Sequence, residues 1–169
     1  TTLHIKYNEY VPLALWCASV SSHDCVFIDE NRFAFATAPV LDGGSFLRFV
    51  TTGRNAELDA VVAKEMEFNN LLLLADLLTE QGWFVSHVEI DQMGDAFLSL
   101  VGGGELKVSA SELAEKTDEN LRVVLTSEQF QHLKPGNFAY IDLRFGSKVF
   151  VNEEGETAST TATSTDIGL

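Results

Sequence analysis

The stretch 56–81 has the residue spacing of an amphipathic helix and stands between groups of short strand-like runs. Asn55 suits the N-cap position, and Gly82 suits the residue just past the C-terminal end. A chain has to bury such an apolar stripe against another element, and the flanking runs provide a sheet. The stripe recurs three and four positions apart: Leu58, Val61, Phe68, Leu71, Leu72, Ala75 and Leu78.

Runs with the two-residue period of strands lie on both sides of this helix. Glu30-Asn31 and Gly102–Gly104 each separate two such runs and suit hairpin turns, which favours antiparallel pairing. A second, shorter helix is predicted over 118–133, ending at Pro135-Gly136. The predicted class is therefore α+β, with a mostly antiparallel sheet packed against one long and one shorter helix. The predicted strands are 3–10, 13–17, 25–29, 32–36, 83–90, 96–101, 105–108 and two closing runs within 137–151.

Length and charge limit the functional classes. The 169 residues suit one domain, or one domain plus part of another. The formal net charge of −14, from 25 acidic and 11 basic residues, repels phosphate backbones and anionic lipid headgroups. We therefore expect no nucleic-acid partner. The chain starts at Thr1 and its first residues already resemble a strand, so we expect a fragment whose membrane anchor would lie upstream.

The two cysteines, Cys17 and Cys25, flank a Ser-rich loop that could close a hairpin. Paired strands would bring their sulfur atoms within bridging distance, so a disulfide is one possibility. The alternative is two small buried side chains. A zinc site would need four ligands, and His23 adds only one to this pair.

No sequence pattern for catalysis, cofactor binding or metal binding emerges. Ser22-His23-Asp24 contains the residue types of a hydrolase triad, but adjacent residues cannot converge as a triad does. Gly102–Gly104 lacks the Lys-Ser/Thr of a phosphate-binding loop. We expect no enzymatic activity, cofactor or metal. The competing hypothesis is a secreted or periplasmic hydrolase with a site near His23 and Asp24, which requires these residues to meet the Gly102 turn in a cleft.

The closing segment, 137–151, contains two strand-like runs, and a polar Thr-, Ser- and Ala-rich tail follows it. We predict that this tail, 153–169, is disordered because it has almost no large apolar residues to bury. The strand 147–151 would then be a sheet edge, open to a partner strand. Asp142 and Arg144 share one strand face, so they either pair with each other or leave Arg144 free for a partner.

Several motifs, in order, resemble those of one protein family. The sequence Tyr140-Ile-Asp-Leu-Arg-Phe145 resembles the (Y/I)-(V/I)-D-L-R-(Y/F) signature near the C-terminus of the bacterial cell-division family of FtsQ and DivIB. Pro12-Leu-Ala-Leu-Trp16 resembles its Pro-x-Ala-x-Trp segment, and Gly82-Trp-Phe-Val85 its G-x-x-V/I strand start. Val26–Phe35 is similar to V-D-x-x-G-x-x-F, with Arg32 near the usual glycine. The resemblance spans roughly 2–151.

The resemblance implies a non-catalytic divisome scaffold, held in the cell membrane by a single-pass anchor, with this part on the extracytoplasmic side. It implies residues 1–11 as the end of a truncated POTRA-like domain, 12–152 as an FtsQ/DivIB-type β domain and 153–169 as the tail. The implied partners are FtsB/DivIC-like and FtsL-like division proteins, whose binding helps control septal peptidoglycan synthesis. A POTRA-containing secretion component is the remaining alternative.

By the same resemblance, the expected partner-binding residues are Arg144, Phe145, Ser147, Lys148, Val149, Phe150 and Val151. Arg144 would meet an acidic partner residue, and Lys148 stands where the family often has glycine. On this hypothesis, Phe145→Ala or a charge reversal at Arg144 leaves folding intact and abolishes partner binding.

Overall fold

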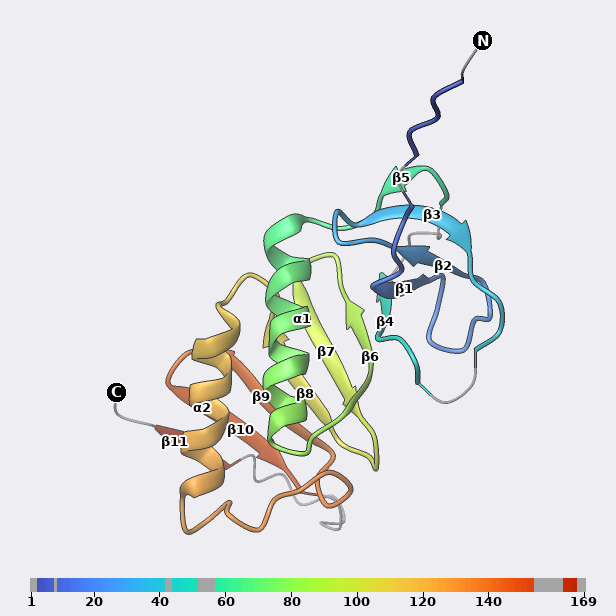
Figure 1. The fold of residues 1–169 in the computed structure, drawn as a ribbon. Coiled ribbons are helices and arrows are strands. Elements are labelled where there is room, and N and C mark those ends of the chain that lie inside the picture. The colour runs from blue at the N-terminus through green and yellow to red at the C-terminus, as the bar shows by residue number, and fades with distance from the viewer. Residues whose placement is uncertain (1–2, 8, 42–43, 52–56, 154–162, 167–169) are drawn as a thin grey trace.

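The computed structural model describes residues 3–7, 9–41, 44–51 and 57–153, and the backbone of 163–166. All its strands belong to one sheet, in the order β11-β10-β9-β8-β7-β6-β4-β1-β2-β3-β5 (Figure 1). The helices are α1 (Glu65–Glu80) and α2 (Ala114–Thr126). The strands are β1 (Ala14–Cys17), β2 (Cys25–Ile28), β3 (Phe33–Thr37), β4 (Arg48–Thr51), β5 (Ala60–Val61), β6 (Val85–Ile90), β7 (Asp95–Leu100), β8 (Glu105–Ser109), β9 (Tyr140–Phe145), β10 (Lys148–Asn152) and β11 (Thr163–Asp166).

The fold is α+β: a mixed sheet with two helices. The pairs β1–β4, β4–β6 and β8–β9 are parallel, and the other pairs are antiparallel. Parallel neighbours need a long crossover, and helices fill two of these: α1 lies between β4 and β6, and α2 between β8 and β9. The sequence alone could not predict this arrangement, because it depends on which strands become neighbours.

Both helices cover the same face of the sheet (Figure 1). The strands β4 and β8 run in the same direction, and both crossovers step toward β11. Two crossovers of the same hand and direction place their helices on the same side. Among the described residues, no helix therefore lies on the opposite face of β6–β10.

The main core lies between the sheet and the two helices. Phe49 packs against Phe68 of α1 with ring centroids 4.9 Å apart, and both side chains are fully buried. Trp83 stacks on Phe138, centroids 5.7 Å apart, just before β9 begins. This packing fixes the position of β9 relative to the rest of the sheet.

The long helix starts later than the sequence predicted. The prediction of a helix over 56–81 is wrong at its N-terminal end, because Asp59 adopts a left-handed backbone (φ 59°) and Ala60–Val61 form β5. Leu58 and Val61 are accordingly exposed, whereas Phe68, Leu71, Ala75 and Leu78 are buried as predicted. The N-cap prediction at Asn55 falls outside the described residues. The second helix is Ala114–Thr126 rather than 118–133, because Ser127 adopts an extended backbone that ends it.

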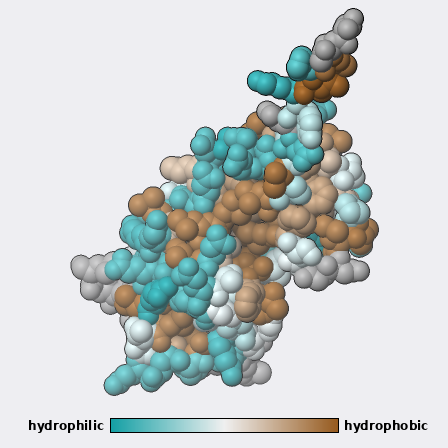
Figure 2. All heavy atoms as spheres, in the orientation of Figure 1, coloured by the Kyte–Doolittle hydropathy of each residue, from teal (hydrophilic) through white to brown (hydrophobic). Residues whose placement is uncertain are grey.

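The N-terminal stretch projects from the body of the molecule (Figure 1). The prediction of a strand over 3–10 is wrong for its described residues, none of which is in a strand. Leu3, Ile5 and Tyr7 are 81%, 73% and 77% exposed. Figure 2 shows hydrophobic residues, in brown, on part of this projection. A strand needs a neighbour for its backbone groups, and among the described residues this stretch has no such neighbour.

A disulfide joins Cys17 and Cys25, which face each other in the β1–β2 register with Cα atoms 4.1 Å apart. Both cysteines are buried in a second, smaller apolar cluster with Leu15, Ala38 and Val50. The bond therefore closes the loop 18–24 and anchors this cluster.

We expect the Cys17–Cys25 bond to raise the free energy of unfolding by about 2.5 kcal/mol, the loop-entropy value for a closure of this length. Denaturant titration with and without dithiothreitol measures this difference. A variant with Cys17→Ala and Cys25→Ala is the control and should not respond to the reductant. Equal stability of the native protein with and without reductant would contradict the expectation.

Candidate functional site

The residues predicted for partner binding lie in the hairpin formed by β9 and β10. Tyr140–Phe145 forms β9 in full, and the turn Gly146-Ser147 leads into β10. Gly146 adopts a left-handed backbone (φ 64°), which a glycine adopts without steric cost. The pairing shifts register between Lys148 and Phe150, the signature of a β-bulge, and bulges re-aim side chains at strand ends.

Alternation along the hairpin separates a core face from an outer face. Ile141, Leu143, Val149 and Val151 are buried in the main core. Phe145 and Lys148 are exposed, and Phe150 is partly buried on the outer face. Of the seven predicted partner-binding residues, Val149 and Val151 therefore have side chains that face the core rather than the outer surface.

Arg144 is held within the protein. Its Nε donates to Asp142 Oδ1 at 2.9 Å, its Nη2 donates to Asp142 Oδ2 at 2.6 Å, and its Nη1 donates to Asp95 Oδ2. The hydrogen bond with Asp142 raises the pKa of Arg144, while burial opposes that rise. Two alternatives were predicted for Arg144: a pair with Asp142, or a free cation that meets a partner. The structure shows the pair with Asp142. Asp95 completes the cluster from β7, and the sequence analysis missed it because no local pattern links residues 49 positions apart.

A hollow of about 440 Å³ lies on the outer face beside this cluster. Its lining is mainly aromatic and basic, with one carboxylate that pairs with Arg144. The lining residues are Lys107, Tyr140, Asp142, Arg144, Phe145, Lys148 and Phe150. Phe145 and Phe150 meet edge to face with centroids 5.4 Å apart, and the Lys107 ammonium lies 3.9 Å from the centroid of the Tyr140 ring. Rings and cations in one concave surface suit an apolar side chain next to a carboxylate.

The hollow gathers three of the 11 basic residues of a chain whose net charge is −14. Lys107 and Tyr140 come from strands that are neighbours only in the folded sheet, so the sequence analysis missed both. Ser147 lies in the turn and does not line the hollow. Arg144, Phe145, Lys148 and Phe150, all predicted for partner binding, do meet there.

The strand β10 is not the edge of the sheet. It pairs antiparallel with β11, and the register places Val149 opposite Thr165 and Val151 opposite Thr163. The prediction that 147–151 forms the last strand is therefore wrong, as is the prediction of a disordered tail at Thr163–Asp166. Residues 154–162 and 167–169 of that predicted tail lie outside the described residues. The pairing arises because β10 presents a row of backbone groups that a Thr-rich strand can satisfy.

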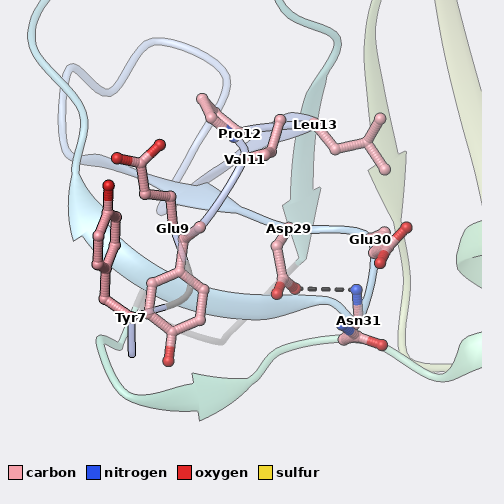
Figure 3. A pocket seen from close by; sticks show the side chains of 9 residues that line it. Tyr7, Glu9, Val11, Pro12, Leu13, Asp29, Glu30 and Asn31 are labelled. Atoms are coloured by element: carbon pink, nitrogen blue, oxygen red, sulfur yellow. Dashed lines mark hydrogen bonds between the residues drawn. The ribbon is translucent and has the colours of Figure 1, made fainter. Parts of the chain in front are cut away.

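A second hollow, of about 910 Å³, lies where the N-terminal stretch meets the β2–β3 turn (Figure 3). The Asp29 carboxylate faces back into the turn and accepts hydrogen bonds from the backbone N–H groups of Asn31 and Phe33, both at 2.9 Å. Asp29 therefore shapes the turn. Glu9 and Glu30 also line the hollow, which makes it acidic.

The site required by the hydrolase hypothesis does not form. His23 and Asp24 lie in the β1–β2 loop, at the end of the sheet where β6 also ends, since β1, β4 and β6 run parallel. The turn at Gly102 follows β7, which runs antiparallel to β6, so it lies at the opposite end. Within the described part of the chain, no group of three or more His, Cys, Asp or Glu residues could hold a metal ion.

Comparisons with models of known protein families and with curated proteins found no match to this chain. No helix among the described residues has both the length and the apolar character needed to cross a bilayer.

Proposed function

We propose that this chain is the extracytoplasmic β domain of an FtsQ/DivIB-type division protein, a non-catalytic scaffold that binds FtsB/DivIC- and FtsL-like partners. The observation that carries the proposal is the hairpin β9–β10, where the Asp-Leu-Arg signature lies beside a concave aromatic and basic surface. In such a scaffold, this binding would help control septal peptidoglycan synthesis.

The hairpin supports binding by strand addition at the side of the sheet formed by the C-terminal strands. A partner strand beside β10 would gain main-chain hydrogen bonds, each contributing about 0.5–1.5 kcal/mol net. Side chains of the partner strand that reach the hollow at Phe145, Lys148 and Phe150 would contribute selectivity. An acidic and apolar partner segment matches that lining.

The disulfide between Cys17 and Cys25 supports an extracytoplasmic location, because such bonds persist in oxidising compartments. A membrane-anchored scaffold with this domain outside the cytoplasm fits that chemistry.

Phe145→Ala tests the role of the hairpin. Phe145 is 55% exposed, so its loss should change the free energy of unfolding by less than about 1 kcal/mol. At an interface, removal of a central aromatic side chain typically costs 2 kcal/mol or more, so affinity should fall by roughly 30-fold. The measurement is isothermal titration with the C-terminal segment of the FtsB/DivIC-like protein from the same genome.

Phe84→Ala is the matched control, because Phe84 is also 55% exposed but lies just before β6, away from β10. It should leave the affinity unchanged. Equal affinities of the Phe145→Ala variant and the native protein would contradict the assigned role of the hairpin.

A further inference from the structure

The strand β11 lies where a partner strand would dock. It pairs with β10 along four residues, from Lys148 opposite Asp166 to Val151 opposite Thr163. An antiparallel neighbour satisfies the backbone groups along that side of β10, so a second strand cannot use the same groups at the same time. The chain therefore contains its own occupant for the surface that a partner would need.

Because β11 belongs to the same chain as β10, it has an advantage over a free partner strand. Ten residues, 153–162, join the end of β10 to the start of β11. A connection of that length gives tethered segments an effective concentration on the order of millimolar. A strand too weak to bind as a free peptide can thus remain paired when it is tethered.

The sequence of β11 also makes it replaceable. The strand reads Thr-Ser-Thr-Asp and contains no large apolar residue. Its register places threonines opposite Val149 and Val151, which are 0% and 7% exposed. Residues opposite each other on neighbouring strands share a face, so a competing strand with valine or isoleucine at those two positions would bury more apolar area.

We propose that β11 is a built-in competitor that holds the side of β10 closed until a strand with apolar residues in register with Val149 and Val151 displaces it. This proposal concerns the regulation of the binding surface and rests on the proposed function for the identity of the natural partner. The preferred occupant also carries an acidic residue opposite Lys148, the position that Asp166 holds in β11.

The first test needs no partner. Backbone amide hydrogen exchange is compared between the full chain and a chain that ends at Glu153. We expect amides within Lys148–Asn152 that are protected in the full chain to exchange at least tenfold faster after the deletion, while those of β6–β8 stay unchanged. Equal exchange in the two chains would overturn the proposal.

A variant of the full chain distinguishes the loss of β11 pairing from a folding defect caused by the deletion. In the full chain, Ser164→Pro with Thr165→Pro removes two successive N–H groups, so at least one that faces β10 is lost. This variant should reproduce the faster exchange. Ser164→Ala with Thr165→Ala keeps both N–H groups and should not.

The second test measures competition with a synthetic peptide of residues 157–169 in which Thr163→Val and Thr165→Val have been introduced. If the closed form holds about nine-tenths of the molecules, deletion of the tail should tighten peptide binding by about tenfold. The unsubstituted peptide should bind the shortened chain more weakly than the valine peptide. Unchanged or weaker binding after the deletion would overturn the proposal, because β11 would then not compete for the docking position.

The two proposals fail in different ways. If the valine peptide binds more tightly after the deletion but the FtsB/DivIC-like segment binds neither chain, the competitor stands and the division assignment is contradicted. If that segment binds both chains with equal affinity at β10, the assignment stands and the competitor is contradicted.

Discussion

Arg144→Glu should lower the free energy of unfolding by about 3 kcal/mol, because it leaves the buried Asp142 carboxylate without its cation. The new carboxylate would also face Asp95, so three acidic groups would meet where a cation now joins two. The sequence-based expectation that a charge reversal here leaves folding intact is therefore replaced by an expected loss of stability. Guanidinium chloride titration, monitored by circular dichroism, measures the difference in the free energy of unfolding between the native protein and the variant.

Lys116→Glu is the control for charge reversal. Lys116 donates to Glu112, four residues before it, at 3.0 Å, and the two side chains are 49% and 39% exposed. Exposed pairs of this kind contribute at most about 1 kcal/mol. Equal losses from the Lys116 and Arg144 variants would contradict the structural role assigned to the Asp95–Asp142–Arg144 cluster.

The pKa of Arg144 is raised, so its contribution has a defined pH dependence. A base with a raised pKa in the folded state contributes stability that is fully present below its unfolded pKa and is lost as the pH rises through the folded pKa. Both values lie far above neutral for an arginine. The cation should therefore contribute equally across the neutral pH range.

Gly104→Ala should destabilise the protein by about 2–4 kcal/mol through overpacking and backbone strain. A Cβ atom on Gly104 would lie 2.6 Å from Cε2 of Phe138, and the glycine has a left-handed backbone with φ of 89°. Phe138 is fully buried and stacked on Trp83, so its ring has no room to move away. The free energy of unfolding from denaturant titration gives the measured cost.

Gly82→Ala separates the two causes of that cost. Gly82 also has a left-handed backbone, with φ of 81°, but a Cβ atom there would meet nothing within 4 Å. Its variant should lose only the conformational part, about 1 kcal/mol. If Gly104→Ala costs no more than Gly82→Ala, the close approach of the β7–β8 turn to Phe138 does not constrain the fold.

Local patterns predicted the elements whose structure is decided locally. The hairpin turns at Glu30-Asn31 and Gly102–Gly104 are confirmed, because turn residues act within a few positions. The apolar stripe of α1 is confirmed from Phe68 to Leu78 for the same reason.

Elements decided by distant neighbours were not predictable. Asp95 reaches Arg144, and Lys107 reaches the hollow, only because β8 lies beside β9 and β7 lies beside β8, an order that no sequence pattern specifies. The strand β11 has the composition of a disordered tail, and its structure depends on pairing with β10. The β5 strand replaces the first turns of the predicted helix because β3 offers it a partner.

The proposed function requires that a partner strand binds at β10 and the adjoining hollow. The most direct measurement is an NMR titration of the chain that ends at Glu153 with the C-terminal segment of the FtsB/DivIC-like protein from the same genome. The proposed function predicts shifts concentrated at Arg144–Val151 and Lys107, with new amide protection along β10. Binding that shifts resonances only at the β1–β3 end of the sheet, or no binding at high micromolar peptide, would contradict it.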